Sequence, residues 1–227
     1  AGGVPHFIFS STAATYGMPE VERVTEQTPQ SPINPYGWSK LMTERMLADV
    51  SAAHPLNHCA LRYFNVAGAD PQGRSGQSTA GATHLIKVAS EAALGKRNGM
   101  DVYGTDYPTP DGTCVRDYVH VSDIAHAHTL ALKHLLEGES KEAVEVFNLG
   151  SGEGSTVLEV INAFETATGV KLNWEFAPPR PGDVVAVYAD RTKAQQELGW
   201  ELKYNLQQMM ETAWEWAHHL NNTLGGR

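Results

Sequence analysis

The chain has 227 residues and a formal net charge of −9, with 41% hydrophobic and 19% charged residues. This length is enough for one large domain or two small ones around a buried core, and the composition excludes a disordered chain. No segment reaches the roughly 18 consecutive apolar residues of a membrane span. An acidic balance without a basic stripe also argues against nucleic acid as a partner. We therefore expect a globular protein with neither a membrane nor a nucleic acid as its partner.

The cysteines and histidines give no sign of a disulfide framework or a metal site. Cys59 and Cys114 are far apart in the sequence and form no C-x-x-C pair. We expect both to be small buried thiols in a cytoplasmic protein. His126 and His128 are two positions apart on a predicted helix and so point to different faces. None of the 10 histidines has a spacing typical of metal ligands, and we predict no metal.

The first part of the chain is predicted to form a strand, a helix and a second strand. Phe7–Phe9 is an apolar run that predicts a buried strand, and it leads into the polar residues 10–12. From Tyr36 onward, apolar residues recur at three- and four-residue spacing after a proline, which is typical of a helix. Residues 58–64 (HCALRYF) predict a second strand, and Asn65 follows it. Because ligands of parallel sheets bind beyond the carboxyl ends of the strands, these polar residues are expected to converge on one crevice.

The rest of the chain continues the alternation of strands and helices. Residues 67–84 are rich in glycine and polar side chains and predict a long loop. Ser122 is an expected N-cap with Asp123 in the first turn. Thr156 and Glu159 form a capping box at the start of another helix. Further helices are predicted at 85–94, 122–136 and 207–220, and a strand at 144–149. The predicted fold class is α/β.

One glycine-rich stretch needs a separate interpretation. Gly150, Gly152 and Gly154 follow a predicted strand and precede a helix, as the glycines of a dinucleotide-binding loop do. Their spacing, G-x-G-x-G, differs from the G-x-G-x-x-G of that loop. We interpret the stretch as a tight turn into the capped helix rather than as a phosphate-binding loop.

Tyr36 and Lys40 are candidates for proton-transfer chemistry. Four positions apart on a helix, they lie on one face. A free phenol has a pKa of about 10 and is a poor base at neutral pH. A nearby ammonium and an oxidised nicotinamide both favour the phenolate, which could then take a hydroxyl proton as hydride departs. Thr12, at a neighbouring strand end, could bond the same hydroxyl. The spacing alone leaves a second interpretation open, in which a half-buried aromatic residue and a solvated lysine begin an ordinary helix.

Six ordered motifs make the first interpretation stronger. They are FSSTAATYG, INPYGWSK, LRYFNVAGADP, YPTPDGTCVRDYVHVSD, FNLGSGEG and RPGDV. In this order they resemble the UDP-glucose 4-epimerase family of the extended short-chain dehydrogenase/reductases, over about Phe7 to Ala213. The resemblance implies the C-terminal part of a Rossmann-type doubly wound parallel sheet, with a smaller α/β domain for the substrate. It also implies NAD as cofactor and a UDP-sugar as substrate.

The resemblance implies roles for individual residues. The catalytic residues would be Tyr36 as base, Lys40 as its electrostatic partner and Thr12 as an aid to proton transfer. The cofactor-binding residues would be Tyr36, Lys40, Tyr63, Ser10 and Ser11. The substrate-binding residues would be Thr12, Phe64, Asn65, His84, Leu85, Arg116, Arg180, Asp183 and Val187. Within this set, Arg116 and Arg180 match arginines that bind the UDP diphosphate, and Asp183 matches an acid that bonds the uridine ribose. His84 departs from the asparagine that the family often has.

The activity implied is the interconversion of UDP-galactose and UDP-glucose. NAD would oxidise the C4 hydroxyl of the sugar, the 4-keto sugar would rotate, and hydride would return to the other face. Alternative substrates are UDP-N-acetylhexosamines and UDP-pentoses, and a third alternative is a non-catalytic nucleotide-sugar-binding remnant.

Two positions bear on the choice between these reactions. Related 4,6-dehydratases carry Thr-Asp-Glu where this chain has Thr12, Ala13 and Ala14, so the acid and base for loss of water are missing. Val187 stands where the family varies between a tyrosine and small residues. A small residue leaves room for an N-acetyl group, although Val187 could equally be a packing residue.

The family resemblance also predicts a domain division. Residues 1–66 would be what remains of the NAD-binding domain and 67–227 mainly the substrate domain, with about 120–150 returning to the first sheet. The family's first strand and its glycine-rich turn, part of roughly 100 residues, have no counterpart ahead of Ala1. We therefore expect the 227-residue chain alone to bind NAD poorly, to be inactive and to aggregate. The complete protein is expected to be a homodimer through a helical bundle that includes the Tyr36 helix.

Overall fold

The structure is a computed structural model that describes residues 3–138 and 142–224. The chain divides into two compact units. The first unit takes in the described parts of Ala1–Asn65, Asp123–Glu153 and Val187–Leu202. The second takes in Val66–Ser122, Gly154–Ala186 and the described part of Lys203–Arg227. Each unit is therefore assembled from segments that are far apart in the sequence.

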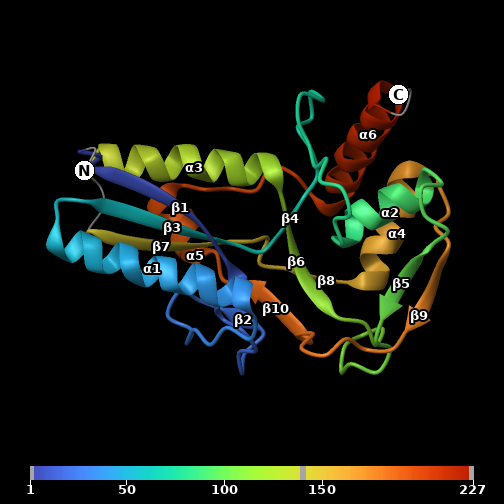
Figure 1. Cartoon of the computed structure of the whole chain (residues 1–227), viewed down its shortest axis with the longest axis horizontal. Helices are drawn as coiled ribbons and strands as arrows, with labels where there is room; N and C mark the ends of the chain where they lie inside the picture. The colour runs from blue at the N-terminus through green and yellow to red at the C-terminus, as the bar shows by residue number, and fades with distance from the viewer. Residues whose placement is uncertain (1–2, 139–141, 225–227) are drawn as a thin grey trace. The chain divides into compact units, whose positions relative to one another are not determined.

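A parallel sheet with strand order β1-β3-β7 forms the first unit. The strands are β1 (His6–Thr12), β3 (Asn57–Tyr63) and β7 (Val144–Leu149). The helices are α1 (Pro35–Ala53), α3 (Val121–Leu136) and α5 (Thr192–Leu198). A 3₁₀ turn, η1 (Ala13–Thr15), follows β1, and the short strand β2 (Arg23–Val24) pairs in parallel with β10 (Ala186–Ala189). Figure 1 shows the sheet with α1 on one face and α3 on the other.

The contacts of neighbouring strand residues agree with this layering. Ser11 and Arg62 are register partners, and both bond Glu44 of α1. The side chains of adjacent residues on a strand point to opposite faces of the sheet. Accordingly, Tyr63 reaches His128 of α3 and also bonds Ser10. The carboxyl ends of β1 and β3 therefore present different side chains to the two helices.

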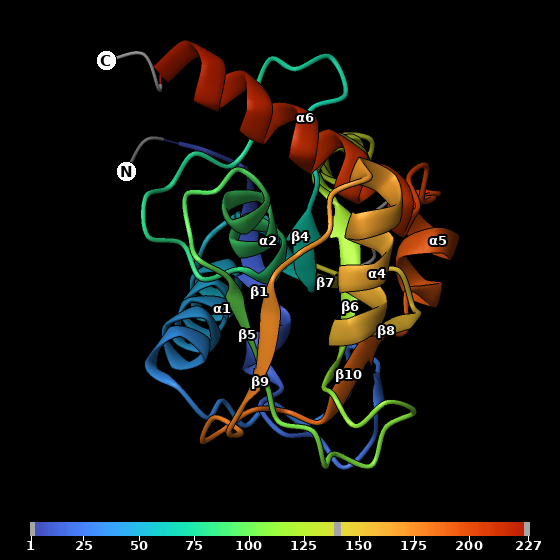
Figure 2. The same cartoon turned by 90° about the vertical axis from the view of Figure 1, so that its right-hand side faces the viewer.

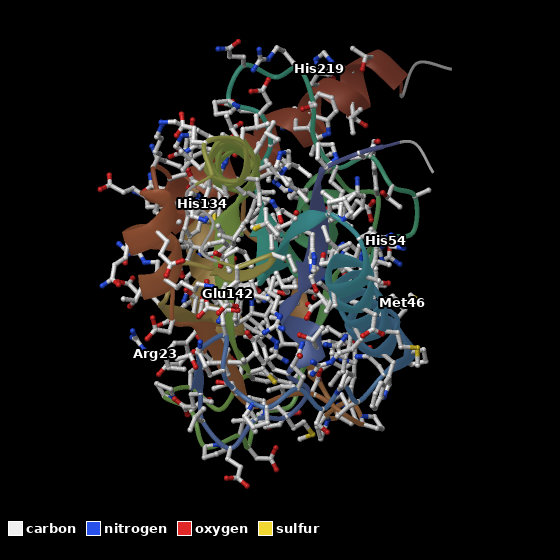
Figure 3. All side chains as sticks on the ribbon, turned by 90° about the vertical axis from the view of Figure 1, so that its left-hand side faces the viewer. Arg23, Met46, His54, His134, Glu142 and His219 are labelled. Atoms are coloured by element: carbon white, nitrogen blue, oxygen red, sulfur yellow. The ribbon has the colours of Figure 1, made fainter. Side chains whose placement is uncertain are left out.

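The start of α1 sets the position of Tyr36 and Lys40. Asn34 has extended backbone angles, and its side chain accepts a hydrogen bond from Gly37 N at 2.8 Å, so Asn34 is the N-cap. Pro35 occupies the first turn, as predicted. The predicted apolar periodicity is helical, but its burial is uneven. Leu41 is buried, whereas Met42, Met46 and Val50 are exposed, and Figure 3 shows Met46 at the periphery of the fold.

Two local predictions were wrong. The strand predicted at Phe7–Phe9 is present, but it was expected to be buried and Phe7 is 43% exposed. In the described part of the chain, β1 pairs with β3 alone. Ser122 was expected to cap α3, but the helix already begins at Val121. The backbone N–H of Ser122 donates to His120 Nδ1 instead.

The second unit combines short strands with three helices. The strands are β4 (Asn65–Ala67), β5 (Met100–Tyr103), β6 (Val115–His120), β8 (Gly154–Thr156) and β9 (Trp174–Ala177). The helices are α2 (Leu85–Ala93), α4 (Val157–Thr168) and α6 (Leu206–Leu224). β5 and β9 pair in parallel, while β6 and β8 are antiparallel. The predicted capping box of Thr156 and Glu159 is present. Figure 2 shows α4 beside α6. Phe164 of α4 and Met210 of α6 belong to the same hydrophobic core.

None of the described helices is both long and apolar enough to cross a membrane.

Candidate active site

The Tyr36–Lys40 pair lies where α1 meets the carboxyl end of β1. The Tyr36 side chain is 55% exposed, so its phenol is accessible to a ligand. Lys40 Nζ lies 5.8 Å from the centroid of the Tyr36 ring and 5.1 Å from that of Phe9. The same ammonium donates a hydrogen bond of 2.9 Å to the backbone oxygen of Ser10. The ammonium is therefore held beside the phenol by the strand that carries the predicted cofactor-binding serines.

Thr12 takes a different local role. Its Oγ1 accepts a hydrogen bond of 3.2 Å from Ala14 N and thereby caps η1. Among the described residues, no hydrogen bond joins Thr12 to Tyr36. A shared contact with a substrate hydroxyl therefore remains a prediction for these two side chains.

Tyr63 lies on the face of the sheet opposite α1. It forms hydrogen bonds with Ser10 and with His128, which was not predicted as a partner. The Tyr63 hydroxyl donates to Ser10 Oγ at 2.8 Å and lies 2.6 Å from His128 Nε2. His128 Nδ1 lies 2.9 Å from the carbonyl oxygen of Ile124. Burial is the main reason that the pKa of Tyr63 is raised. Tyr63 thus remains a neutral hydroxyl that ties the ends of β1 and β3 to α3.

Phe64, Asn65 and Val187 differ in how far they are available to a ligand. Phe64 is 9% exposed and belongs to a small core with Tyr16. Val187 is half-buried and packs against this core. A packing role is therefore observed, while part of the Val187 side chain remains exposed. Asn65 is exposed at the start of β4.

In the second unit, the predicted diphosphate-binding residues form one cluster. Arg180 donates two hydrogen bonds to Asp183, at 3.2 and 3.3 Å. Arg116 Nη2 lies 3.7 Å from the same carboxylate, and Arg116 Nη1 donates to the backbone oxygens of Val115 and Val184. The Arg180 guanidinium also lies over the Tyr103 ring, 4.5 Å from its centroid. Asp183 therefore holds both arginines in place, and their charges are suited to phosphate oxygens.

His84 and Leu85 mark the beginning of α2. His84 occupies the N-cap position without a side-chain cap bond, and its Nδ1 lies 2.9 Å from Gln77 Nε2. Leu85 is half-buried and packs against the core of the second unit. The structure thus gives Leu85 a packing role and leaves His84 exposed.

A buried polar network beneath Tyr36 and Lys40 was not predicted. Glu44 accepts two hydrogen bonds from Arg62, at 2.6 and 3.1 Å, and further bonds from Ser11 and Gln30. The side chains of Arg62 and Glu44 are 4% and 8% exposed. Arg62 also bonds the hydroxyl of Tyr16, which donates to Asn148 of β7. Burial opposes ionisation of Glu44, but the bonds and charge of Arg62 outweigh it and lower the pKa of Glu44.

The residues present fit one end of a nicotinamide cofactor. An accessible phenol, an adjacent ammonium and the exposed Ser10 lie together at a strand end of a parallel sheet, where ligands of such sheets bind. Gly152 has φ of 78° in the turn before β8, as expected for a tight turn. The phenol, the ammonium and Ser10 are the kinds of group that the predicted nicotinamide and its ribose would require, and their roles remain predictions.

Comparison with known proteins identifies the family. The family model described as GDP-mannose 4,6 dehydratase matches residues 4–213. A UDP-glucose 4-epimerase of Azospirillum brasilense is 50% identical over 224 residues, which are 98% of this chain and 64% of the relative. This chain therefore spans less than two thirds of that relative's length. The matches of this chain to these proteins agree with its predicted membership of the extended short-chain dehydrogenase/reductases.

Two solved structures agree with this assignment. The UDP-glucose 4-epimerase of Stenotrophomonas maltophila, with bound NAD and formylated UDP-arabinopyranose, is 39% identical with a TM-score of 0.93, over 97% of this chain and 65% of that one. The UDP-Glc/GlcNAc 4-epimerase of Campylobacter jejuni is 47% identical with a TM-score of 0.79, over 96% and 65%. The chain belongs to the UDP-glucose 4-epimerase family. The predicted α/β fold class is confirmed.

The Glu44–Arg62 pair leads to a prediction about stability. Replacing Glu44 with Leu leaves Arg62 buried without its counter-charge and should lower the free energy of unfolding by about 3–5 kcal/mol. Because the pKa of Glu44 is lowered in the folded state, the contribution of its charge is present above its unfolded pKa of about 4.3 and is lost as the pH falls through the folded pKa. Urea unfolding at neutral and acidic pH measures both effects. A Glu44→Leu variant as stable as the parent protein at neutral pH would contradict the prediction.

Proposed function

We propose that this protein interconverts UDP-galactose and UDP-glucose at C4 of the sugar, with NAD as cofactor. The observation that carries the proposal is the accessible Tyr36 phenol with the Lys40 ammonium fixed beside it at the end of β1. The names of the relatives support the reaction, and bound NAD in one of the similar structures supports the cofactor. When bound, NAD supplies hydride acceptance and hydride return at one carbon.

The residues of this chain would handle the proton and the charge. Tyr36 takes the proton of the C4 hydroxyl and later returns it, so the base is regenerated in each cycle. Lys40 stabilises the phenolate by its charge, because an opposite charge nearby favours the ionised form. Thr12 bonds the reacting hydroxyl and helps to orient it. Ser10, Ser11 and Tyr63 are assigned to the cofactor. Ser11 would act indirectly, because its hydroxyl is bonded to Glu44.

The remaining predicted residues are assigned to the nucleotide sugar. Arg116 and Arg180 bind the diphosphate, and Asp183 bonds the uridine ribose while it orders the arginines. Phe64, Asn65, His84, Leu85 and Val187 are assigned to the sugar-nucleotide region, with Phe64 and Leu85 acting through packing. The two units correspond in this proposal to a cofactor-binding part and a UDP-sugar-binding part.

Two other functions, dehydration and non-catalytic binding, are less well supported. Dehydration needs an acid and a base next to Thr12, but η1 begins with Ala13 and Ala14, which can supply neither. A non-catalytic nucleotide-sugar-binding protein would have no need for the joint presence of Tyr36, Lys40 and Thr12. Epimerisation of a UDP-pentose uses the same groups, and the similar structure with a bound UDP-arabinopyranose derivative keeps it as an alternative.

We also propose that the complete protein is a homodimer in the cytoplasm. Met42, Met46 and Val50 expose apolar side chains along α1, and such faces mark interaction sites. Cys59 and Cys114 are both free and buried, which suits a reducing compartment. Burial raises the pKa of Cys59 to about 12, so this thiol stays protonated.

The reaction itself is tested by removing the phenol. Tyr36→Phe should lower kcat for UDP-galactose by about 10²–10⁴-fold, which is the usual contribution of a positioned general base. The assay follows UDP-glucose formation with NAD present in the full product of the reading frame, because the 227-residue chain alone is expected to give no conversion. UDP affinity, measured by calorimetry, should be unchanged. Conversion by the Phe variant at the parent rate would contradict the role of Tyr36.

The diphosphate assignment is tested by UDP binding. Arg180→Leu removes a hydrogen bond to a charged group, which contributes about 1.5–3 kcal/mol, so Kd for UDP should rise about 10- to 150-fold. Arg97→Leu is the matched control, because Arg97 is also a partly exposed arginine paired with a carboxylate in the second unit. Equal affinities of the two variants would count against the assignment.

Val187 is tested by substrate choice. If a small residue at this position admits an N-acetyl group, Val187→Tyr should slow conversion of UDP-N-acetylgalactosamine by about tenfold or more, which corresponds to about 1.4 kcal/mol. The rate with UDP-galactose in the same variant is the internal control. A parent protein that converts the N-acetylated sugar no faster than the variant would favour a packing role alone.

A further inference from the structure

We propose that Gly37 and Glu44 are positioning residues that seat α1 on the end of β1 and thereby fix the Lys40 ammonium at Ser10. The inference rests on the proposed function, because it gives a catalytic purpose to the placement of the Tyr36–Lys40 pair. The two positions lie on either side of Lys40 in the sequence, and each is tied to a different part of the β1–η1 segment.

Gly37 determines how closely the first turn of α1 approaches η1. A Cβ atom at this position would lie 2.6 Å from the backbone oxygen of Ala14 and 3.0 Å from Cβ of Pro32. The first of these contacts is with backbone, so it cannot be relieved by rotating a side chain. Only glycine permits the observed approach, and any larger residue requires the first turn of α1 and the Ala14 backbone of η1 to move apart.

Glu44 holds the helix a little less than two turns further on. Its carboxylate accepts hydrogen bonds from Ser11 of β1 and from Arg62 of β3. Ser11 and Arg62 are register partners on adjacent parallel strands. Because the two strands hold one carboxylate from two directions, rotation of α1 about its axis would break at least one of these bonds.

Lys40 lies between these two contacts along the helix. Its Nζ reaches the backbone oxygen of Ser10, at 2.9 Å, and Ser10 precedes the serine that bonds Glu44. The ammonium lies against the rings of Phe9 and Tyr36, at 5.1 and 5.8 Å from their centroids. A shift or roll of α1 would move Lys40 away from Ser10, although nothing in the Lys40 side chain itself had changed.

The alternative is that the Glu44–Arg62 pair only adds stability. The two cases differ in a signal from Lys40. In ¹⁵N-labelled protein, the Lys40 ammonium should give a slowly exchanging NMR resonance because of its bond to Ser10, and its side-chain protons should carry ring-current shifts from Phe9 and Tyr36. The resonance is assigned with Lys40→Met. It is then recorded in the full chain for Gly37→Ala and Glu44→Gln.

Two control variants match the two changes. Glu145→Gln alters another buried carboxylate of the first unit, which pairs with Lys193 at 3.1 Å. Asp49→Ala raises helix propensity at an exposed position of α1 without a steric conflict. Gly37→Ala also raises helix propensity, so loss of the signal there cannot be explained by a weaker helix. Circular dichroism establishes that each variant is folded.

We expect the protected Lys40 resonance and its ring-current shifts to be lost in Gly37→Ala and in Glu44→Gln, and kept in both controls. If Glu44→Gln does not fold, Gly37→Ala decides the outcome alone. A Lys40 resonance unchanged in a folded Gly37→Ala protein, or absent from the parent protein, would overturn the inference. Because the readout needs neither cofactor nor turnover, failure of the proposed epimerase activity would not alter this result.

Discussion

The first unit depends on one buried ion pair, that between Glu44 and Arg62. Removing two charges from water costs several kcal/mol for each ion, and only good geometry and additional hydrogen bonds offset this cost. Here Glu44 is bonded by Ser11 and Gln30 as well as by Arg62, and the lowered pKa of Glu44 reflects those bonds. Arg62 in turn reaches Tyr16, which bonds Asn148. A single network thus connects α1 with all three strands of the parallel sheet.

Because of the pleat of the sheet, the strand residues that stabilise α1 and the strand residues proposed to contact the cofactor point to opposite faces. Ser11 and Arg62 point toward α1 and take part in the buried network, whereas the neighbouring Ser10 is bonded to Tyr63, which reaches His128 of α3. Residues proposed to contact the cofactor therefore alternate along β1 with a residue that supports them. Ser11 was assigned to the cofactor from the family resemblance alone, but its hydroxyl is already bonded to a buried carboxylate.

Local signals in the sequence predicted much of this arrangement. The proline before Tyr36 and the apolar spacing beyond it placed α1, and Thr156 and Glu159 placed the start of α4. These features depend on residues within one turn of each other. Glu44, Arg62 and His128 were not predicted as partners, because their contacts join segments that are distant in the sequence. Nor does spacing alone show that Phe7 lies on an edge strand, since exposure depends on which strands are paired. The residue roles and the domain division remain predictions.

The register of β1 against β3 limits how this protein can vary. Ser11 pairs with Arg62 and Thr12 with Tyr63, so each strand residue has a fixed face. Inserting or deleting one residue within β1 would turn Ser10 toward α1 and Ser11 toward α3, and it would break the networks on both faces at once. Changes in chain length are therefore better tolerated outside β1, for example in the long irregular segment 68–84. In β1, sequence divergence can proceed by substitution alone.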